Sequence, residues 1–203
     1  MTLSPEASDV PDASPELDPQ QLALYSFGLF STLQGAVTAG MVHLGDRLGL
    51  YRAMRDLAHP VTSAELAEAA GLHERWVREW AYNQAAARMI SVETPAVDSP
   101  GAERFWLTPE ATAVLASPDH PAFGMGMFHR LPQTMHALTG MPECFRTGLG
   151  HDYDSHGCEG AIGIERSFEP WNTANLLPVV LPALDGVVER LEAGITAADI
   201  LIH

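Results

Sequence analysis

Apolar residues recur at three- and four-residue spacing over the first long segment of the chain, which predicts a long α-helix. The helix would begin near Pro19 and continue past Gly45, and this whole stretch contains no charged side chain. A membrane span of that length is disfavoured, because glutamine, serine, threonine and histidine side chains interrupt the apolar run. Either a second copy of the chain or the core of the same subunit would cover such a helix, and we predict a dimer. The positions that define the pattern are Leu22, Tyr25, Leu29, Leu33, Met41, Leu44 and Leu48.

Two short helices are predicted next, because a capping signal is followed by a stop and then by a second helical pattern. Thr62 or Ser63 is placed to cap the first helix, which carries Glu65 in its first turn and stops at Gly71. The second helix is predicted from about residue 74 to residue 88. Its inward stripe consists of Val77, Trp80, Ala81 and Ala85. Two helices joined by such a short turn form a helix-turn-helix.

A strand, a loop and a return strand are predicted after the second helix. Residues 89–93 are apolar and β-branched, residues 94–102 are rich in turn-forming residues, and residues 104–108 alternate in polarity. This arrangement is the wing of a winged helix. Thr108 then caps another helix, with Pro109 at its first position and a stop at Ser117.

The rest of the chain predicts more helix and one short strand. Residues 119–160 are rich in glycine, proline, methionine and histidine, which favours short helices separated by loops. Helical periodicity returns over residues 162–175 and again over 176–193, where Leu181, Leu184, Val187, Val188 and Leu191 share a face. A strand-like run over residues 195–202 follows. The predicted fold class is therefore mainly α, with long N-terminal dimerisation helices, a winged helix-turn-helix and a C-terminal helical segment leading to one orphan strand.

Charge makes nucleic acid an unfavourable partner. The 203 residues include 26 acidic and 11 basic side chains, all of the latter arginine, for a net charge of -15. Arginines on the second helix of the helix-turn-helix stand four residues from glutamates, at Glu74 and Arg78 and at Arg75 and Glu79. Trp76 and Trp80 occupy positions where small polar base readers are expected. Cys144 and Cys158 form no C-x-x-C pair, which is typical of a protein of the reducing cytoplasm.

Five segments, in order along the chain, resemble one protein family. They are GDRLGLYRAM, PVTSAELAEAAGLHERWVREW, FWLTPEATAVLA, ERSFEPW and LPALDGVVERLEAG. This series is similar to the N-terminal half of bacterial class I S-adenosylmethionine-dependent methyltransferases, which carry a winged helix ahead of a Rossmann-like catalytic domain. The likeness extends from about Leu22 to Asp199. The alternative function for a winged helix is a transcriptional regulator that binds DNA.

The resemblance implies a cofactor motif that these residues do not contain. In the family, the first strand of the catalytic domain ends in an acidic residue and continues into a glycine-rich turn that lies against S-adenosylmethionine. Here the strand begins at Ala197 and continues through Leu201 and Ile202 to His203 without a glycine. We therefore expect a truncated, accessory part of a methyltransferase, with no catalytic or cofactor-binding residue of its own and no activity alone. The expected domains are a disordered acidic tail (1–19), dimerisation helices with a winged helix (20–117), a helical substrate cap (118–194) and a truncated first strand (195–203).

The resemblance also places a cap over the acceptor pocket, from about Phe123 to Trp171. The candidate polar residues of this cap are His129, Tyr153 and His156, with a histidine as the proton acceptor for a hydroxyl substrate. The alternative is that they are solvated loop residues. A nearby group of histidine, aspartate, cysteine and glutamate residues over 151–159 matches no established metal-ligand spacing, so we expect no metal.

Overall fold

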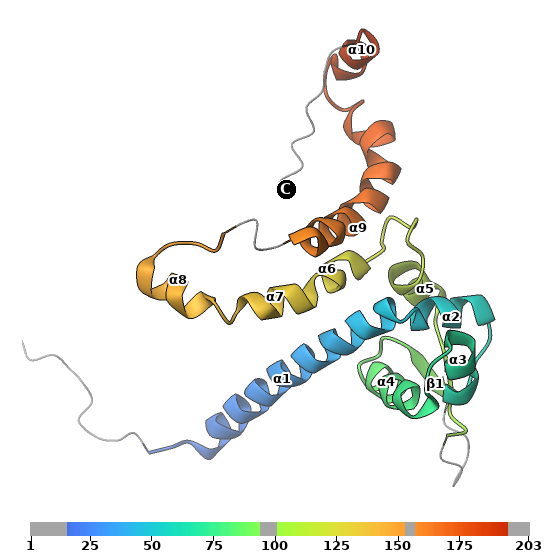
Figure 1. Cartoon of the computed structure of the whole chain (residues 1–203), viewed down its shortest axis with the longest axis vertical. Coiled ribbons are helices and arrows are strands. Elements are labelled where there is room, and N and C mark those ends of the chain that lie inside the picture. The colour runs from blue at the N-terminus through green and yellow to red at the C-terminus, as the bar shows by residue number, and fades with distance from the viewer. Residues whose placement is uncertain (1–15, 94–100, 153–156, 195–203) are drawn as a thin grey trace, which may run out of the picture. The chain divides into compact units, whose positions relative to one another are not determined.

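The computed structural model describes residues 16–93, 101–152 and 157–194, and this part of the chain is mainly α-helical (Figure 1). The chain divides into one compact unit that ends at Ala36 and a second that begins at Val37. Helix α1 (Pro19–Arg47) starts in the first unit and ends in the second. The predicted long helix is thus confirmed. The expected disordered tail falls outside the described residues up to residue 15, and the expected orphan strand over 195–203 lies outside them entirely.

The helix-turn-helix forms as the sequence predicts. Helix α2 (Leu50–Leu57) precedes α3 (Ser63–Ala70) and α4 (Glu74–Ala86). Thr62 and Glu65 form a capping box, in which each side chain accepts a hydrogen bond from the backbone N–H of the other residue. Gly71 ends α3 with a φ of 66°, a left-handed conformation that suits a glycine.

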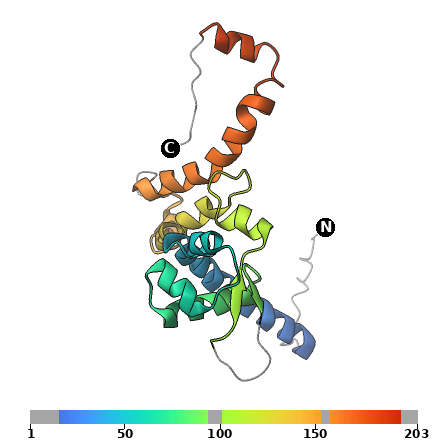
Figure 2. The same ribbon diagram turned by 90° about the vertical axis from the view of Figure 1, so that its right-hand side faces the viewer.

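The predicted wing is a two-stranded antiparallel hairpin (Figure 2). Strand β1 (Ser91–Glu93) pairs with β2 (Arg104–Trp106), and Val92 lies opposite Phe105. Helix α5 (Pro109–Leu115) follows, with the Thr108 side chain accepting a hydrogen bond from the backbone N–H of Ala111. The strand, loop and strand order and the cap of the next helix are confirmed.

The core of the second unit lies mostly inside the winged helix and extends to the start of α6. Tyr51 is buried with its ring edge against Trp80, at 5.2 Å between ring centroids. Its hydroxyl donates a hydrogen bond to Gln84 Oε1 at 2.6 Å. Burial, and secondarily the nearby Asp46 carboxylate, raise the pKa of Tyr51 above its ordinary value. Gly45 is required here, because a Cβ at that position would lie 2.7 Å from both rings. The fully buried side chains also include Leu50, Val61, Leu66, Val77, Phe105 and Met125.

Short helices separated by loops follow the winged helix, as expected. They are α6 (Met125–His129), α7 (Leu131–Ala137) and α8 (Met141–Thr147), followed by the longer α9 (Gly157–Asn175). Helices α6 and α9 pack closely at glycines. A Cβ on Gly126 would lie 2.6 Å from the carbonyl oxygen of Gly163, so the two backbones touch where they cross.

The prediction of one continuous helix over residues 176–193 is wrong. A short π-helical turn, η2 (Leu176–Val180), is followed by turns and then by α10 (Val187–Glu192). Pro182 lacks the backbone N–H that a continuous helix needs, and Gly186 adopts a φ of 69° just before α10. Neither η2 nor α10 contains a buried residue, so the apolar face predicted there does not pack into the described core.

Candidate functional site

The structure describes one of the three candidate cap residues. Tyr153 and His156 lie outside the described residues. His129 is the last residue of α6, and its side chain is 11% exposed. Both ring nitrogens face α9: Nδ1 lies 2.9 Å from Arg166 Nη1, and Nε2 lies 2.7 Å from Glu159 Oε2. His129 is therefore a nearly buried residue and not a solvated loop side chain.

The contact with Arg166 determines the tautomer of a neutral His129 ring. A guanidinium has only donors, so Nδ1 must accept from Arg166 and the ring proton of a neutral His129 is on Nε2. Nε2 faces the Glu159 carboxylate at ion-pair distance, but the contact lacks the alignment of a hydrogen bond. Both nitrogens are thus directed at α9. For His129 to accept a substrate proton, one of these two contacts has to open.

Arg166 connects His129 to a buried carboxylate at the end of α1. Its Nη1 and Nη2 donate to Asp46 Oδ2 at 2.8 Å and to Asp46 Oδ1 at 2.9 Å, a two-pronged pair. Arg52 adds a contact of 3.3 Å to the same carboxylate. Asp46 is 5% exposed and Arg166 is 25% exposed. We call the five residues Asp46, Arg52, His129, Glu159 and Arg166 the charged cluster.

The charged cluster ties α6 and α9 to the winged helix. Asp46 and Arg52 belong to α1 and α2, whereas His129 and Arg166 belong to α6 and α9. The side chain of His43 adds a further link, with Nδ1 2.8 Å from the carbonyl oxygen of Phe128. Two acids and two arginines balance in charge around a single imidazole. The arrangement holds α6 and α9 in fixed positions relative to the end of α1.

The sequence predictions included His129 but missed the other members of the charged cluster. The available signal was the position of Asp46, the first acid after 27 uncharged residues. A charge that follows directly on a long apolar helix often enters the core with it and then requires a counter-ion. Arg166 lies 120 residues away along the chain, and no local pattern connects the two.

The surface of α4 differs from a typical base-reading helix. Trp76 is 70% exposed, and the Arg75 guanidinium lies over its ring at 5.7 Å. Arg78 pairs with Glu74 at 3.5 Å, as the four-residue spacing predicts. On the wing, Arg104 lies 3.6 Å from Glu65. Two of the arginines that would face a phosphate backbone are thus already next to acids.

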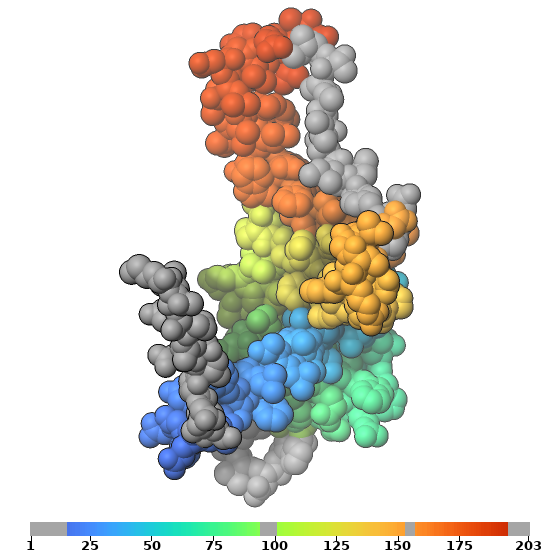
Figure 3. Space-filling view, turned by 90° about the vertical axis from the view of Figure 1, so that its left-hand side faces the viewer, coloured from blue at the N-terminus to red at the C-terminus, as the bar shows by residue number. Residues whose placement is uncertain are grey.

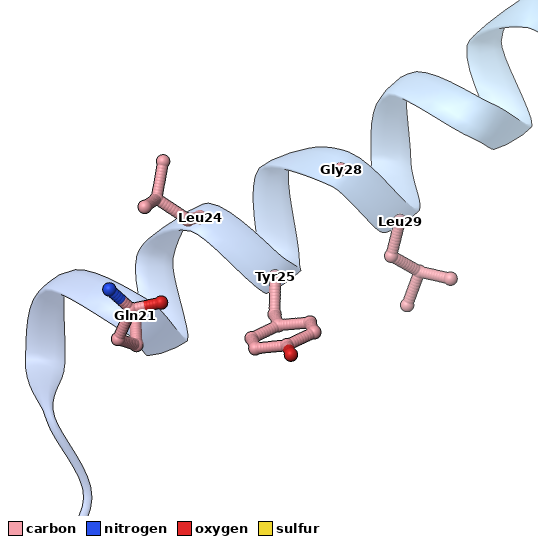
Figure 4. A pocket seen from close by; sticks show the side chains of 5 residues that line it. All are labelled: Gln21, Leu24, Tyr25, Gly28 and Leu29. Carbon is pink, nitrogen blue, oxygen red and sulfur yellow. The ribbon is translucent and has the colours of Figure 1, made fainter.

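The first half of α1 presents an apolar surface. All side chains over residues 16–37 are exposed, and those of Tyr25, Phe27 and Leu29 are exposed by more than 70%. Figure 3 draws this half of α1 in blue. An ordinary core helix therefore does not describe this half of α1. A shallow, open notch of about 430 Å³ lies at Gly28 on the surface of α1, lined also by Gln21, Leu24, Tyr25 and Leu29 (Figure 4). Length and composition alone would also let α1 cross a membrane, which is weak support for a span because core helices and signal sequences share these properties.

The described residues do not fit S-adenosylmethionine. A nucleotide-type site needs a strand that runs through a glycine-rich turn into a helix. Within 16–93, 101–152 and 157–194, the only strands are the two short antiparallel strands of the wing. No group of three metal-ligand side chains gathers in this part of the chain either.

Comparison with known proteins gives one matching domain family and several solved structures with a similar fold. Residues 36–116 match the family of Rv2258c-like winged helix-turn-helix domains. The fold is similar to human N-acetylserotonin methyltransferase bound to S-adenosylmethionine, with a TM-score of 0.56 and 15% identity, over 86% of this chain and 51% of that one. It is also similar to mitomycin 7-O-methyltransferase MmcR, with a TM-score of 0.51 and 18% identity, over 77% of this chain and 47% of that one.

This chain spans about half the length of each methyltransferase structure. A search of curated protein sequences gave no match. At these identities the structural likeness shows a shared fold, and the domain match identifies the region that carries the helix-turn-helix, the wing and α5. Residues 36–116 are thus similar to Rv2258c-like winged helix-turn-helix domains, and the observed fold of this segment is a winged helix.

Proposed function

We propose that this chain is the accessory part of an S-adenosylmethionine-dependent small-molecule methyltransferase. In this role the winged helix and α1 join two copies, and the segment over residues 118–194 shapes the acceptor site. The main support for this proposal is the length of chain over which the fold is similar to a methyltransferase. It covers 86% of this chain, well beyond the winged helix at residues 36–116. A free-standing DNA-binding winged helix does not account for α6 to α9.

The charged cluster supports an acceptor-shaping role. It fixes α6 and α9 against the end of α1, so polar groups on these helices have defined positions. Pre-organised polar groups are what substrate orientation requires. Cofactor binding then falls to a separate domain, since the described residues do not fit S-adenosylmethionine. We propose that the 203-residue chain alone neither binds this cofactor nor transfers a methyl group, which isothermal titration with S-adenosylmethionine tests.

The apolar half of α1 supports a homodimer. Its exposed leucine, phenylalanine and tyrosine side chains include Leu22, Leu24, Tyr25, Phe27, Leu29, Phe30 and Leu33. Each contributes on the order of 100 Å² of apolar area, and such a set approaches the roughly 800 Å² per partner of a standard interface. The notch at Gly28 lets a second helix approach the α1 backbone.

Light scattering on the full chain tests the dimer. Tyr25→Glu places a charge beside the notch and is expected to give a monomer. Thr173→Glu adds the same charge to the exposed surface of α9, outside α1, and is the matched control, expected to stay dimeric. A monomeric wild-type chain, or binding of α1 to uncharged lipid vesicles instead of to a second copy, contradicts the dimer.

A winged-helix regulator is the second candidate, favoured by the domain match itself. It predicts a band shift with genomic DNA fragments that weakens steeply as salt rises. The accessory role predicts no sequence-specific shift, in keeping with the net charge of -15. A cytoplasmic setting fits both roles, because Cys144 and Cys158 are free thiols.

A further inference from the structure

A half-open cavity of about 450 Å³ lies within the winged helix, between α2, the loop that follows it, the end of β2 and α5. None of the residues that line it belongs to the charged cluster or to α1. Neither the proposed dimer nor the proposed acceptor-shaping role therefore uses this cavity. Its volume lies within the range of about 300–1,000 Å³ that small-molecule sites occupy.

Contacts on two sides fix the walls of this cavity. Beyond the end of α2, Val61 and Phe105 exchange backbone hydrogen bonds of 2.9 and 2.7 Å, which place residues 58–60 beside residues 106–107. On the other side, Arg55 Nη1 donates to the carbonyl oxygen of Ala116, which joins α2 to the end of α5. The cavity is thus formed before any ligand arrives, as is usual for small-molecule sites. Binding then requires little ordering of the protein.

The lining of the cavity is mainly apolar. Met54 is almost fully buried, and Trp106 and Leu107 are half-buried. Pro60 and Pro109 add two rigid rings at the exposed rim. An indole presents a flat apolar face against which another aromatic ring can stack. This lining favours a planar aromatic molecule.

The charged groups of the lining are basic. Arg55 and His59 both line the cavity, and none of the described residues that line it is acidic. Arg55 Nε and Nη2 each lie 2.8 Å from Asp56 Oδ1, and Nη1 donates to the carbonyl oxygen of Ala116. A guanidinium has five N–H groups, so two of those on Arg55 are left for a ligand. The His59 ring adds a second positive charge when it is protonated.

The pair with Asp56 does not prevent an anion from using Arg55. The Asp56 side chain is 66% exposed, and ion pairs in contact with water contribute little. A carboxylate inside the cavity is shielded from water by the apolar walls, so its attraction to the same guanidinium is stronger. Two further donors line the cavity. Within the described part of the chain, neither the Thr112 hydroxyl nor the Trp106 indole N–H makes a hydrogen bond.

We propose that this cavity binds a planar aromatic carboxylate, with its ring against Trp106 and its carboxylate at Arg55. A carboxylate is an acceptor-only group, which matches a lining that offers donors and no acid. The aromatic body replaces water on the apolar walls. This site goes beyond the proposed function and does not depend on it.

NMR of the indole N–H groups in the full chain tests the site, with 2-naphthoate as the ligand. The chain has four tryptophans, and Trp106→Phe identifies the resonance of Trp106 by its loss. We expect 2-naphthoate to shift this resonance saturably and to leave that of the exposed Trp76 in place. The neutral 2-naphthamide has the same rings and is expected to bind about tenfold more weakly or worse, because it loses the charge-assisted hydrogen bonds. No shift at Trp106, a shift shared by all four tryptophans or equal affinity for the two compounds overturns the proposal.

Two arginines that neighbour tryptophans provide a matched pair of variants. Arg55→Met removes the cation from the cavity and is expected to weaken 2-naphthoate binding by about tenfold or more. Arg75→Met removes the guanidinium that lies over Trp76, outside the cavity, and is expected to leave binding unchanged. Thr112→Phe fills the cavity from α5 and is expected to abolish binding of both compounds, so it serves if Arg55→Met does not fold. Wild-type affinity for 2-naphthoate in a folded Arg55→Met or Thr112→Phe variant overturns the site.

Discussion

Removing Arg166 tests whether the charged cluster holds α6 and α9 to the winged helix. In Arg166→Met, Asp46 loses both of its short hydrogen bonds from α9, at 2.8 and 2.9 Å. Loss of one partner of a buried ion pair costs about 3–5 kcal/mol, because the other charge stays buried without its counter-ion. Two features reduce this cost: Arg166 is 25% exposed, and Arg52 remains 3.3 Å from Asp46. We therefore expect a loss of about 2–3 kcal/mol in the free energy of unfolding.

Urea denaturation followed by circular dichroism measures this loss, and a double-mutant cycle isolates the pair. Asp46→Asn and Arg166→Met are measured singly and together, and the double variant is expected to recover at least about 1.5 kcal/mol of the summed losses. Arg146→Met is the control, because Arg146 pairs with Glu143 on the surface, where both side chains are mostly exposed. That change should cost less than about 0.5 kcal/mol. A coupling below about 0.5 kcal/mol between Asp46 and Arg166 would refute the reasoning.

Three further predictions concern the packing and the ionisable groups. Gly126→Ala places a Cβ 2.6 Å from the Gly163 carbonyl oxygen and is expected to lower Tm by several degrees in thermal unfolding, whereas Gly40→Ala, which lies within α1 and meets nothing within 4 Å, should not lower it. Thr62→Ala removes the hydroxyl half of the capping box, at a cost of about 1 kcal/mol near neutral pH. The backbone N–H of residue 62 and, secondarily, the Thr62 hydroxyl lower the pKa of Glu65, so Glu65 stabilises the fold above its unfolded pKa of about 4.3. The variant keeps the first hydrogen bond and loses the second, so the part of the difference from wild type that comes from the hydroxyl should be lost as the pH of the urea titrations falls below that value and through the lowered pKa. Burial raises the pKa of Tyr51, so the neutral hydroxyl contributes stability that is present below about pH 10 and is lost as pH rises further. In the same urea titrations, the free energy of unfolding of Tyr51→Phe should therefore fall less steeply at alkaline pH than that of wild type. An equal fall in both proteins would contradict the assignment of this stability to Tyr51.

Local signals made the winged helix predictable from sequence. The Thr62 cap, the Gly71 stop and the Thr108-Pro109 start act within a few residues, and all three appear in the structure where the sequence places them. The hairpin follows from two apolar runs on either side of a turn-rich segment, and its register sets Val92 opposite Phe105. In each case the residues that determine the structure are neighbours in the chain.

Long-range features were not predictable in the same way. The pair of Asp46 and Arg166 joins residues 120 positions apart, and nothing local to either one requires the other. The crossing of α6 and α9 depends on Gly126 and Gly163, and nothing near either glycine in the sequence indicates that it packs against the other. The break at residues 181–186 was missed for the opposite reason. Its apolar spacing was regular, and the effect of Pro182 on the backbone outweighed that spacing.

One measurement bears most directly on the accessory role of this chain. Backbone amide NMR of the full chain is recorded during titration with phenol, as a simple hydroxyl acceptor, and separately with S-adenosylmethionine. The account predicts that phenol shifts resonances within residues 123–171, and that S-adenosylmethionine shifts none. Saturable shifts with S-adenosylmethionine, or a phenol response confined to the winged helix, would contradict it.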